Sequence, residues 1–457
     1  MTPSPAPDPP PGAVSSGAAP FAASPPPGGS FTLRRVLLLD PSTGRESPGS
    51  LCVEAGRIKW VGAPEAEPEG EVFDLVGLAV CPGLIDPHVH LRVPGQEHKE
   101  DLVSGTTAAI AGGFTAVCCM PNTTPALDRP ERIAALQARI ATEARCRVHI
   151  AGAATVDNLG EEPTDFAALR AAGCVAITDD AFPLQEVPQM AAALAQAHAA
   201  DLPFLAHLEL RELSAGGVMT AGPVAESLGV PGQSPESETQ ALLRWVQAAD
   251  GIARLHLLHV TTAATARLLH YLRPGPFFAR ISGETAPHYL LLTAAAVRRW
   301  GATAKMNPPL REERDRLALL GALRNGDLEI LATDHAPHAA AEKARGLLDA
   351  PFGVPGLETA LSLTITHLVN TGHVTLLQAL GKMSTNPARL LALPGGTLEP
   401  GSPADLTIID LHKQWTVDPA EFRSKGRATP FAGERLVGKA WGTIVGGEWR
   451  MRDGEVL

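Results

Sequence analysis

The centre of the chain, residues 83–395, alternates short apolar runs with Ala- and Leu-rich stretches of helical character. This alternation is typical of βαβ units, in which a helix returns the chain so that successive strands lie parallel. There are eight such runs: Leu84–His90, Phe114–Met120, Val148–Ala153, Cys174–Thr178, Phe204–His207, Leu255–Val260, Phe277–Glu284 and Ile330–Thr333. Eight parallel units predict an α/β fold with a closed, TIM-like (β/α)8 barrel, whose functional groups lie at the C-terminal ends of the strands.

The flanking segments, residues 31–82 and 396–457, instead contain short strands separated by turn residues. For example, Leu51–Val53 and Ile58–Val61 flank the sequence Glu54-Ala55-Gly56-Arg57, which indicates a hairpin. Neither flank has enough apolar residues to bury a core alone. We therefore expect the two chain ends to pair into one small β-sandwich domain beside the barrel.

Composition limits the partners and the compartment. Residues 1–30 contain ten prolines and no Lys or Arg, which predicts a disordered Pro-rich tail rather than a signal peptide. A net charge of −11 argues against binding to nucleic acid or to an anionic membrane surface. No apolar run reaches the roughly 18 residues that a membrane span needs. The six cysteines form no C-x-x-C pair, as expected for reduced thiols in a cytoplasmic protein.

Side chains that can bind a metal follow most of the predicted strands. His88 and His90 are separated by one residue, so on a strand they point to the same side and can chelate one ion. Further candidates at the strand ends are Asp179 or Asp180, His207, His259 and Asp334. Four histidines and two aspartates at one end of a barrel can hold two divalent metals, with one carboxylate bridging them.

Two of these assignments have competitors in the sequence. His256 competes with His259, but the two face opposite sides of a strand and His259 is nearer its C-terminal end. One of Asp179 and Asp180 faces the barrel interior and the other faces outward, and the residues alone do not decide between them.

The predicted metals suggest the chemistry. Two ions about 3.5–4 Å apart can share a hydroxide whose pKa lies near neutrality, and this hydroxide attacks a polarised carbonyl. Asp334 is placed to be both a ligand and the acid/base that moves the proton to a leaving nitrogen. The predicted reaction is hydrolysis of an amide-type C–N bond, or its reverse. Nearby donors suit an anionic substrate: Arg92, Asn122, Asn307, His338 and the backbone at Phe352 and Gly353.

Several motifs resemble those of the bacterial dihydroorotases, within the cyclic amidohydrolase group. They are Pro82-Gly83-Leu84-Ile85-Asp86-Pro87-His88-Val89-His90-Leu91-Arg92-Val93-Pro94-Gly95, Lys99-Glu100-Asp101, Met120-Pro121-Asn122-Thr123, Asn307-Pro308-Pro309-Leu310-Arg311, Ala332-Thr333-Asp334-His335-Ala336-Pro337-His338 and Phe352-Gly353-Val354-Pro355-Gly356-Leu357-Glu358. The arginine after His-x-His and the Lys-Glu-Asp sequence separate dihydroorotases from allantoinases and hydantoinases.

The resemblance implies two zinc ions held by His88, His90, His207 and His259, with Asp334 as catalytic acid/base. Because no lysine lies near the fourth run, it resembles the branch that bridges its metals with aspartate, and the spacing to His207 favours Asp180. The implied substrate contacts are Arg92, Asn122, Asn307, His338, Phe352 and Gly353. The implied reaction is the reversible cyclisation of N-carbamoyl-L-aspartate to dihydroorotate in pyrimidine synthesis.

One departure from the family pattern follows His207. Relatives usually have Cys-Glu-Asp there, whereas this chain has Leu208-Glu209-Leu210, which changes the surroundings of a predicted ligand. Protein partners consistent with the resemblance are a second copy of the chain, in a homodimer, and aspartate transcarbamoylase. The alternative functions are ring opening of allantoin or a hydantoin, and an inactive scaffold for aspartate transcarbamoylase.

Overall fold

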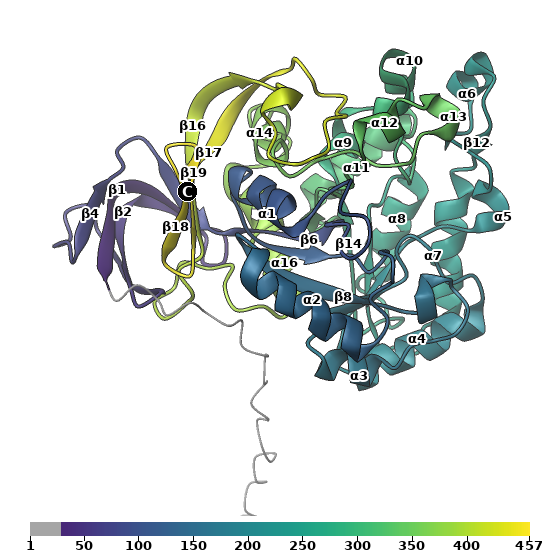
Figure 1. Cartoon of the computed structure of the whole chain (residues 1–457), viewed down its shortest axis with the longest axis horizontal. Helices are drawn as coiled ribbons and strands as arrows, with labels where there is room; N and C mark the ends of the chain where they lie inside the picture. The colour runs from purple at the N-terminus through teal and green to yellow at the C-terminus, as the bar shows by residue number, and fades with distance from the viewer. Residues whose placement is uncertain (1–28) are drawn as a thin grey trace, which may run out of the picture.

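The structure, a computed structural model, describes residues 29–457, so that only Gly29 and Ser30 of the predicted tail lie within the described residues. A barrel and a β-domain lie side by side (Figure 1). In that view the N-terminal strands and the C-terminal strands meet at one side of the barrel, as predicted from the short strands and turns in both flanking segments.

All eight predicted strands of the barrel are present, and they pair in parallel in sequence order. They are β6 (Leu84–Val89), β7 (Phe114–Cys119), β8 (Arg147–Ala153), β9 (Ala176–Thr178), β10 (Phe204–Ala206), β13 (Arg254–Leu257), β14 (Arg280–Thr285) and β15 (Ile330–Leu331). The barrel closes beyond β15, where His335 forms a parallel bridge with Val89 and its carbonyl accepts the N–H of His90 at 2.8 Å. The predicted TIM-like barrel is therefore confirmed.

Two strands begin later than the apolar runs suggest. Strand β9 begins at Ala176 because the N–H of Cys174 bonds the carbonyl of Leu169, at the end of the preceding helix. Strand β14 begins at Arg280, and the carbonyl of Phe277 accepts the N–H of Gly251. At β9 a local turn takes the backbone group of Cys174, whereas at β14 the carbonyl of Phe277 pairs with the loop that precedes β13.

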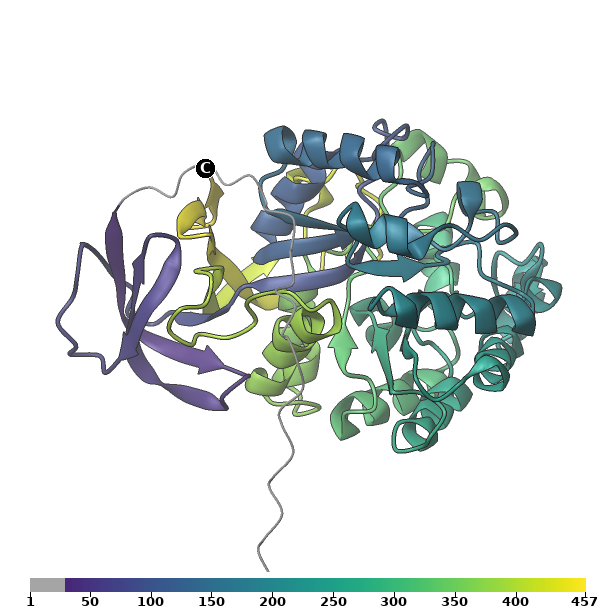
Figure 2. The same ribbon diagram turned by 90° about the horizontal axis from the view of Figure 1, so that it is seen from below.

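Helices surround the barrel (Figure 2). They are α1 (Leu102–Ala111), α2 (Pro130–Glu143), α3 (Phe166–Ala171), α4 (Val187–Ala199), α5 (Arg211–Ser214), α6 (Pro223–Leu228), α7 (Glu236–Ala248), α8 (Ala263–Leu272), α9 (Pro287–Leu291), α10 (Ala296–Trp300), α11 (Glu313–Asn325), α12 (Ala340–Lys343), α13 (Gly346–Asp349), α14 (Ala360–Thr364), α15 (Leu376–Met383) and α16 (Thr385–Leu390). Within residues 29–457, none of these helices has the length and apolar character needed to cross a membrane. A short parallel pair, β11 (Met219–Thr220) and β12 (Gly232–Gln233), lies outside the barrel.

Nine strands from the two chain ends form one curled sheet. They are β1 (Ser30–Asp40), β2 (Arg45–Glu54), β3 (Arg57–Gly62), β4 (Glu71–Asp74), β5 (Ala79–Pro82), β16 (Leu406–Thr416), β17 (Arg435–Val445), β18 (Glu448–Arg452) and β19 (Glu455–Val456). The pairing of β5 with β16 joins the two ends. Although β18 is far from β4 in the strand order, the rings of Trp449 and Phe73 lie 5.1 Å apart. The two halves of the sheet thus face each other across a shared apolar core, as in a sandwich.

The predicted hairpin between β2 and β3 is confirmed. Glu54 pairs with Arg57, and the two residues between them, Ala55 and Gly56, have φ values of 50° and 76°. Two consecutive residues with positive φ are characteristic of the tight type I′ turn that matches the twist of paired strands. All six cysteines are buried free thiols, as predicted.

Candidate metal centre

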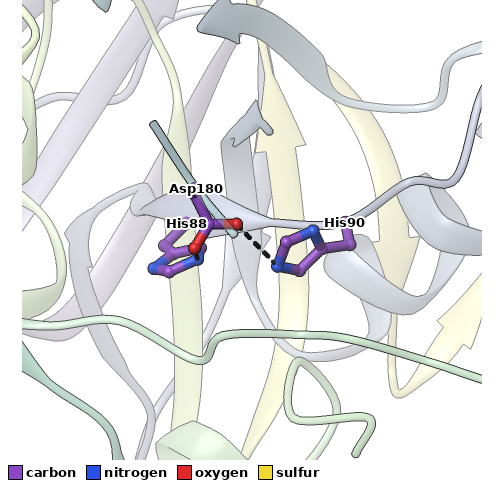
Figure 3. A group of neighbouring side chains, drawn as sticks. All are labelled: His88, His90 and Asp180. Carbon is purple, nitrogen blue, oxygen red and sulfur yellow. Dashed lines mark ion pairs between the residues drawn. The ribbon is translucent and has the colours of Figure 1, made fainter. Parts of the chain in front are cut away.

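The predicted ligands converge inside the barrel mouth, although they come from strands spread over 250 residues of sequence. His88 and His90 lie at the end of β6, and Figure 3 shows both imidazoles directed towards the Asp180 carboxylate beyond β9. The other ligand candidates follow β10, β13 and β15: His207, His259 and Asp334. All six side chains are buried. Two groups of three could each hold an ion: His88, His90 and Asp180, and Asp180, His207 and His259.

Asp180 belongs to both groups. Its Oδ2 lies 3.6 Å from Nε2 of His90, whereas its Oδ1 lies 3.1 Å from Nδ1 of His207 and 3.6 Å from Nε2 of His259. Oδ2 therefore faces His90, whereas Oδ1 faces His207 and His259 and also lies 3.9 Å from Nε2 of His88. A carboxylate shared in this way between the two groups of histidines could bridge two metals.

Asp334 lies on the β6 side of the cluster. Its Oδ1 is 3.5 Å from Nε2 of His88 and 3.3 Å from Nε2 of His90. Burial acts to raise the pKa of the Asp334 carboxyl, but His88 and His90 outweigh it and hold the pKa well below its usual range. The carboxylate is thus ionised at neutral pH, as either a metal ligand or a proton acceptor must be. Its backbone φ of 46° is uncommon for a residue with a side chain.

The chemistry of this donor set fits a divalent metal. Buried polar atoms with no hydrogen-bond partner include Nε2 of His88, Oδ2 of Asp180 and both ring nitrogens of His259. Such atoms are costly to bury unless a ligand satisfies them. Burial acts to lower the pKa of His88, but the carboxylates of Asp334 and Glu284 raise it to about 10. The site therefore favours positive charge, and imidazole with carboxylate is a common ligand set for zinc.

Glu284 contacts two histidines, His88 of the cluster and His256, and was not identified as a site residue from the sequence. Its Oε1 lies 2.7 Å from Nδ1 of His88, and its Oε2 lies 3.1 Å from Nε2 of His256. The contact with Nδ1 leaves the other nitrogen of His88 turned towards the cluster, which is how a carboxylate orients a metal-binding histidine. The position of Glu284 at the end of the seventh run was the only sequence signal for this role.

Hydrogen bonds distinguish the two members in each pair of competing residues. Asp180 enters the cluster, whereas the carboxylate of Asp179 accepts backbone N–H groups from His207 at 2.8 Å and Leu184 at 3.0 Å. Asp179 thus ties the β9 loop to β10. His259 enters the cluster, and His256 is held by Glu284 and by Ser282 at 2.8 Å.

Of the three residues that follow His207, Glu209 is the one whose side chain contacts it. Glu209 Oε2 lies 2.9 Å from Nε2 of His207, while Leu208 and Leu210 are buried among apolar side chains. Burial acts to raise the pKa of Glu209, but contacts with His207 lower it to about 2. The ionised carboxylate turns Nδ1 of His207 towards Asp180.

The predicted substrate donors form a rim beside the cluster. The Arg92 guanidinium is buried, with Nη2 3.2 Å from Nε2 of His338 and Nε donating to the carbonyl of Pro337 at 3.3 Å. Nε2 of His338 lies 2.6 Å from the carbonyl of Phe352, to which it can donate. Burial lowers the pKa of Arg92 to about 10, so the side chain stays charged at neutral pH. Gly353 has a φ of 129°, and a Cβ there would lie 2.4 Å from the carbonyl of Ala336.

The two predicted asparagines each contact the shell of the cluster. Asn122 Oδ1 lies 2.9 Å from Nδ1 of His90, and Asn307 Nδ2 donates to Glu209 at 2.8 Å. Asn307 Oδ1 is buried without a hydrogen-bond partner. A substrate contact by either amide would therefore be coupled to the orientation of a histidine in the cluster.

Similarity to proteins of known family decides the classification. The chain is 42% identical over 417 residues to a dihydroorotase of Pelotomaculum thermopropionicum, covering 91% of this chain and 97% of the relative. It is 43% identical over 419 residues to a dihydroorotase of Syntrophotalea carbinolica, covering 91% and 98%. This chain belongs to the dihydroorotase family. A family model described as Dihydro-orotase-like also matches residues 77–263 of the chain, which include five of the six candidate ligands.

Solved structures place the dihydroorotase fold of this chain among the cyclic amidohydrolases. An L-hydantoinase (dihydropyrimidinase) from Arthrobacter aurescens superposes with a TM-score of 0.84 at 25% identity, over 93% of this chain and 97% of that chain. A dihydropyrimidinase from Brevibacillus agri gives a TM-score of 0.81 at 22% identity, over 94% and 96%, which establishes the shared fold alone. The predicted family is thus confirmed, together with its barrel and flanking β-domain.

Proposed function

We propose that this member of the dihydroorotase family catalyses the reversible cyclisation of N-carbamoyl-L-aspartate to (S)-dihydroorotate plus water, in pyrimidine synthesis in the cytoplasm. The substrate assignment rests on the burial of Arg92 and on the groups that surround its side chain. Its guanidinium is buried, and among residues 29–457 its hydrogen-bond contacts are the carbonyl of Pro337 and the ring of His338, while the nearest negative charges, Asp334 and Asp180, act on it without a direct ion pair. A buried charge that no carboxylate contacts is costly, so a carboxylate of the bound substrate would be a suitable partner for this planar donor.

We further propose that two zinc ions are held by His88, His90, Asp180, His207, His259 and Asp334, with Asp180 shared between them. The unsatisfied ring nitrogens and carboxylate oxygens of this cluster support the assignment. When bound, the ions polarise the substrate carbonyl and lower the pKa of water to near neutrality. The carboxylate of Glu284 and that of Glu209 keep the His88 and His207 rings in their ligating orientations.

Asp334 is assigned the proton transfers. In ring opening, its carboxylate takes a proton from the attacking water and delivers it to the ring nitrogen that leaves. In ring closure, the same group moves the proton in the opposite direction. The lowered pKa of the Asp334 carboxyl keeps it ionised at neutral pH, which is the form that can accept a proton. His338 and the backbone at Phe352 and Gly353, with Asn122 and Asn307, are assigned to substrate binding around Arg92.

A substrate panel on the purified chain tests this function. Dihydrouracil is the matched control for dihydroorotate, because it has the same ring without the carboxylate. We expect dihydroorotate to be opened with a kcat/KM at least about 100-fold higher than dihydrouracil, since a charge-assisted contact is worth roughly 1.5–3 kcal/mol and burying Arg92 unpaired adds to the difference.

Two other outcomes would replace the proposal. Faster opening of allantoin or a hydantoin than of dihydroorotate would assign the chain to another ring substrate, which the shared fold of the hydantoinases permits. Absence of turnover by the metal-loaded chain alone, combined with co-purification with aspartate transcarbamoylase, would assign it a scaffold role.

A further inference from the structure

The sequence Lys99-Glu100-Asp101 is part of the family resemblance, but none of its residues touches the metal cluster. Lys99 contacts α12, whereas Glu100 and Asp101 contact the C-terminal segment 423–426. We propose that the C-terminal segment 423–426 acts through Glu100 to hold the loop Asp334–His338 in its catalytic geometry, which makes Ser424 and Glu100 positioning residues. This inference rests on the function proposed above, because it concerns the loop that carries the assigned acid/base.

Glu100 is the centre of the connection and is fully buried. Its Oε2 lies 3.2 Å from Nε2 of His335 and accepts the hydroxyl of Ser424 at 2.5 Å. Its Oε1 accepts the backbone N–H of Lys425 at 3.2 Å and the hydroxyl of Ser104. One carboxylate therefore joins the residue next to Asp334 to a segment more than 80 residues further along the chain.

His335 transmits this contact to the catalytic loop. Its Nδ1 accepts the N–H of Gly356 at 3.2 Å, so a neutral ring must carry its proton on Nε2 and donate it to Glu100. The carbonyl of the same residue accepts the N–H of His90 at 2.8 Å. The ring and backbone of His335 are thereby fixed between Asp334 and the β6 histidines.

Lys99 and Asp101, on either side of Glu100, contact α12 and segment 423–426. Lys99 Nζ lies 3.4 Å from Glu342 in α12, which follows His338, and Asp101 lies 2.6 Å from Nζ of Lys425. The segment itself alternates, with Ser424 and Gly426 buried and Arg423 and Lys425 exposed, so that an extended backbone turns one face to the barrel. A Cβ on Gly426 would lie only 2.6 Å from Cβ of Pro337, inside the catalytic loop.

The loop needs such support because Asp334 is held at a φ of 46°. A residue with a side chain in this region is strained and stays there only when its surroundings over-determine it. On one side Asp334 is followed by His335, fixed by Glu100. On the other it follows Thr333, whose hydroxyl donates to Asp86. Removing one of these supports should let the backbone at Asp334 relax away from the cluster.

The experiment compares three variants of the full-length, metal-loaded protein. Ser424→Ala removes the hydroxyl that donates to Glu100, and Gly426→Ala presses directly on Pro337. The matched control is Ser362→Ala, since Ser362 is also a buried serine that ties the barrel to the terminal domain, through Gly438 in β17. The measurements are kcat and KM for dihydroorotate, metal content, thermal midpoint and amide hydrogen exchange of residues 334–338 without substrate.

We expect Ser424→Ala and Gly426→Ala to exchange faster across residues 334–338 and to lose about tenfold or more in kcat, with metal content unchanged. For Ser424→Ala, KM should rise as well, because Arg92 donates to the carbonyl of Pro337 and His338 belongs to the same loop. Ser362→Ala should lower the thermal midpoint yet keep the wild-type kcat and exchange in this loop.

Unchanged exchange in both test variants overturns the inference, as does faster exchange with an unchanged kcat. An equal loss of kcat in Ser362→Ala also overturns it, because the effect would then be general destabilisation. If the wild-type chain fails to open dihydroorotate, the proposed function fails, whereas the exchange comparison still decides whether segment 423–426 holds the loop.

Discussion

Glu209 Oε2 lies 2.9 Å from Nε2 of His207, and this contact leaves Nδ1 of the imidazole 3.1 Å from the shared carboxylate of Asp180. A carboxylate behind a ligating histidine sets the ring orientation and raises its basicity. Glu209 stands between Leu208 and Leu210, and its carboxylate is the group of this segment that touches His207.

Glu209→Gln should weaken metal binding by about 10- to 100-fold, because the neutral amide no longer stabilises the ligating form of His207. Competition with a zinc chelator measures the affinity directly. Glu212→Gln is the matched control, since Glu212 pairs with Arg244 at the surface, its one ion pair among residues 29–457. Equal metal affinity in the two variants would show that Glu209 does not support the centre.

Asp334→Asn should retain metal but reduce kcat by about 10²–10⁴-fold, the usual contribution of a positioned acid/base. The amide keeps the shape of the side chain and an oxygen that can still face His88 and His90. Metal analysis and turnover on the same sample separate the two effects. Wild-type turnover in this variant would refute the assigned proton transfers.

Arg92→Ala should raise KM for dihydroorotate by roughly ten- to a hundredfold, as expected for the loss of charge-assisted hydrogen bonds worth about 1.5–3 kcal/mol. Metal content should not change. Arg92→Lys should recover little, because an ammonium cannot reproduce the planar fork. The carboxylate-free ring of dihydrouracil provides the internal control, and its KM should respond far less. An equal effect on both substrates would contradict the carboxylate contact.

The stability of the protein in acid should depend on His149, in β8. Burial, aided by the charge of Arg147, lowers the pKa of His149 to about 4. An unfolded histidine has a pKa near 6.5, so the unfolded chain binds this proton first. The contribution of His149 to stability is thus complete above pH 6.5 and is lost as the pH falls towards 4. The unfolding free energies of wild type and His149→Gln, measured by chemical denaturation, should converge or cross as the pH falls from 6.5 to 4. A constant difference in unfolding free energy from pH 7 to pH 4 would contradict the shifted pKa.

The sequence predicted the ligand candidates because each lies at the end of an apolar run, and parallel strands bring their carboxyl ends together. His88, His207 and Asp334 could therefore be placed at one mouth before any contact was known. The choice between Asp179 and Asp180 could not be made from the residues, since it depends on which carboxylate captures the N–H groups of His207 and Leu184.

The supporting residues were harder to predict. Glu284 is 196 positions from His88, and Ser424 is 324 positions from Glu100, with no local pattern to link them. Lys343 gives a further example. This buried ammonium donates to the carbonyls of Lys305, Pro351 and Gly353, and so joins the two loops that carry Asn307 and Phe352. Such contacts arise only when the barrel closes and its loops meet.

The central claim is that Asp180 joins two metal sites which together open the dihydroorotate ring. The most direct test is metal content measured together with dihydroorotate turnover on the same purified chain, before chelation, after chelation and after return of zinc. We expect two equivalents of zinc per chain, loss of turnover on removal and recovery as both equivalents are restored. Full turnover by the metal-free chain, or two bound zinc ions without any opening of dihydroorotate, would contradict this account.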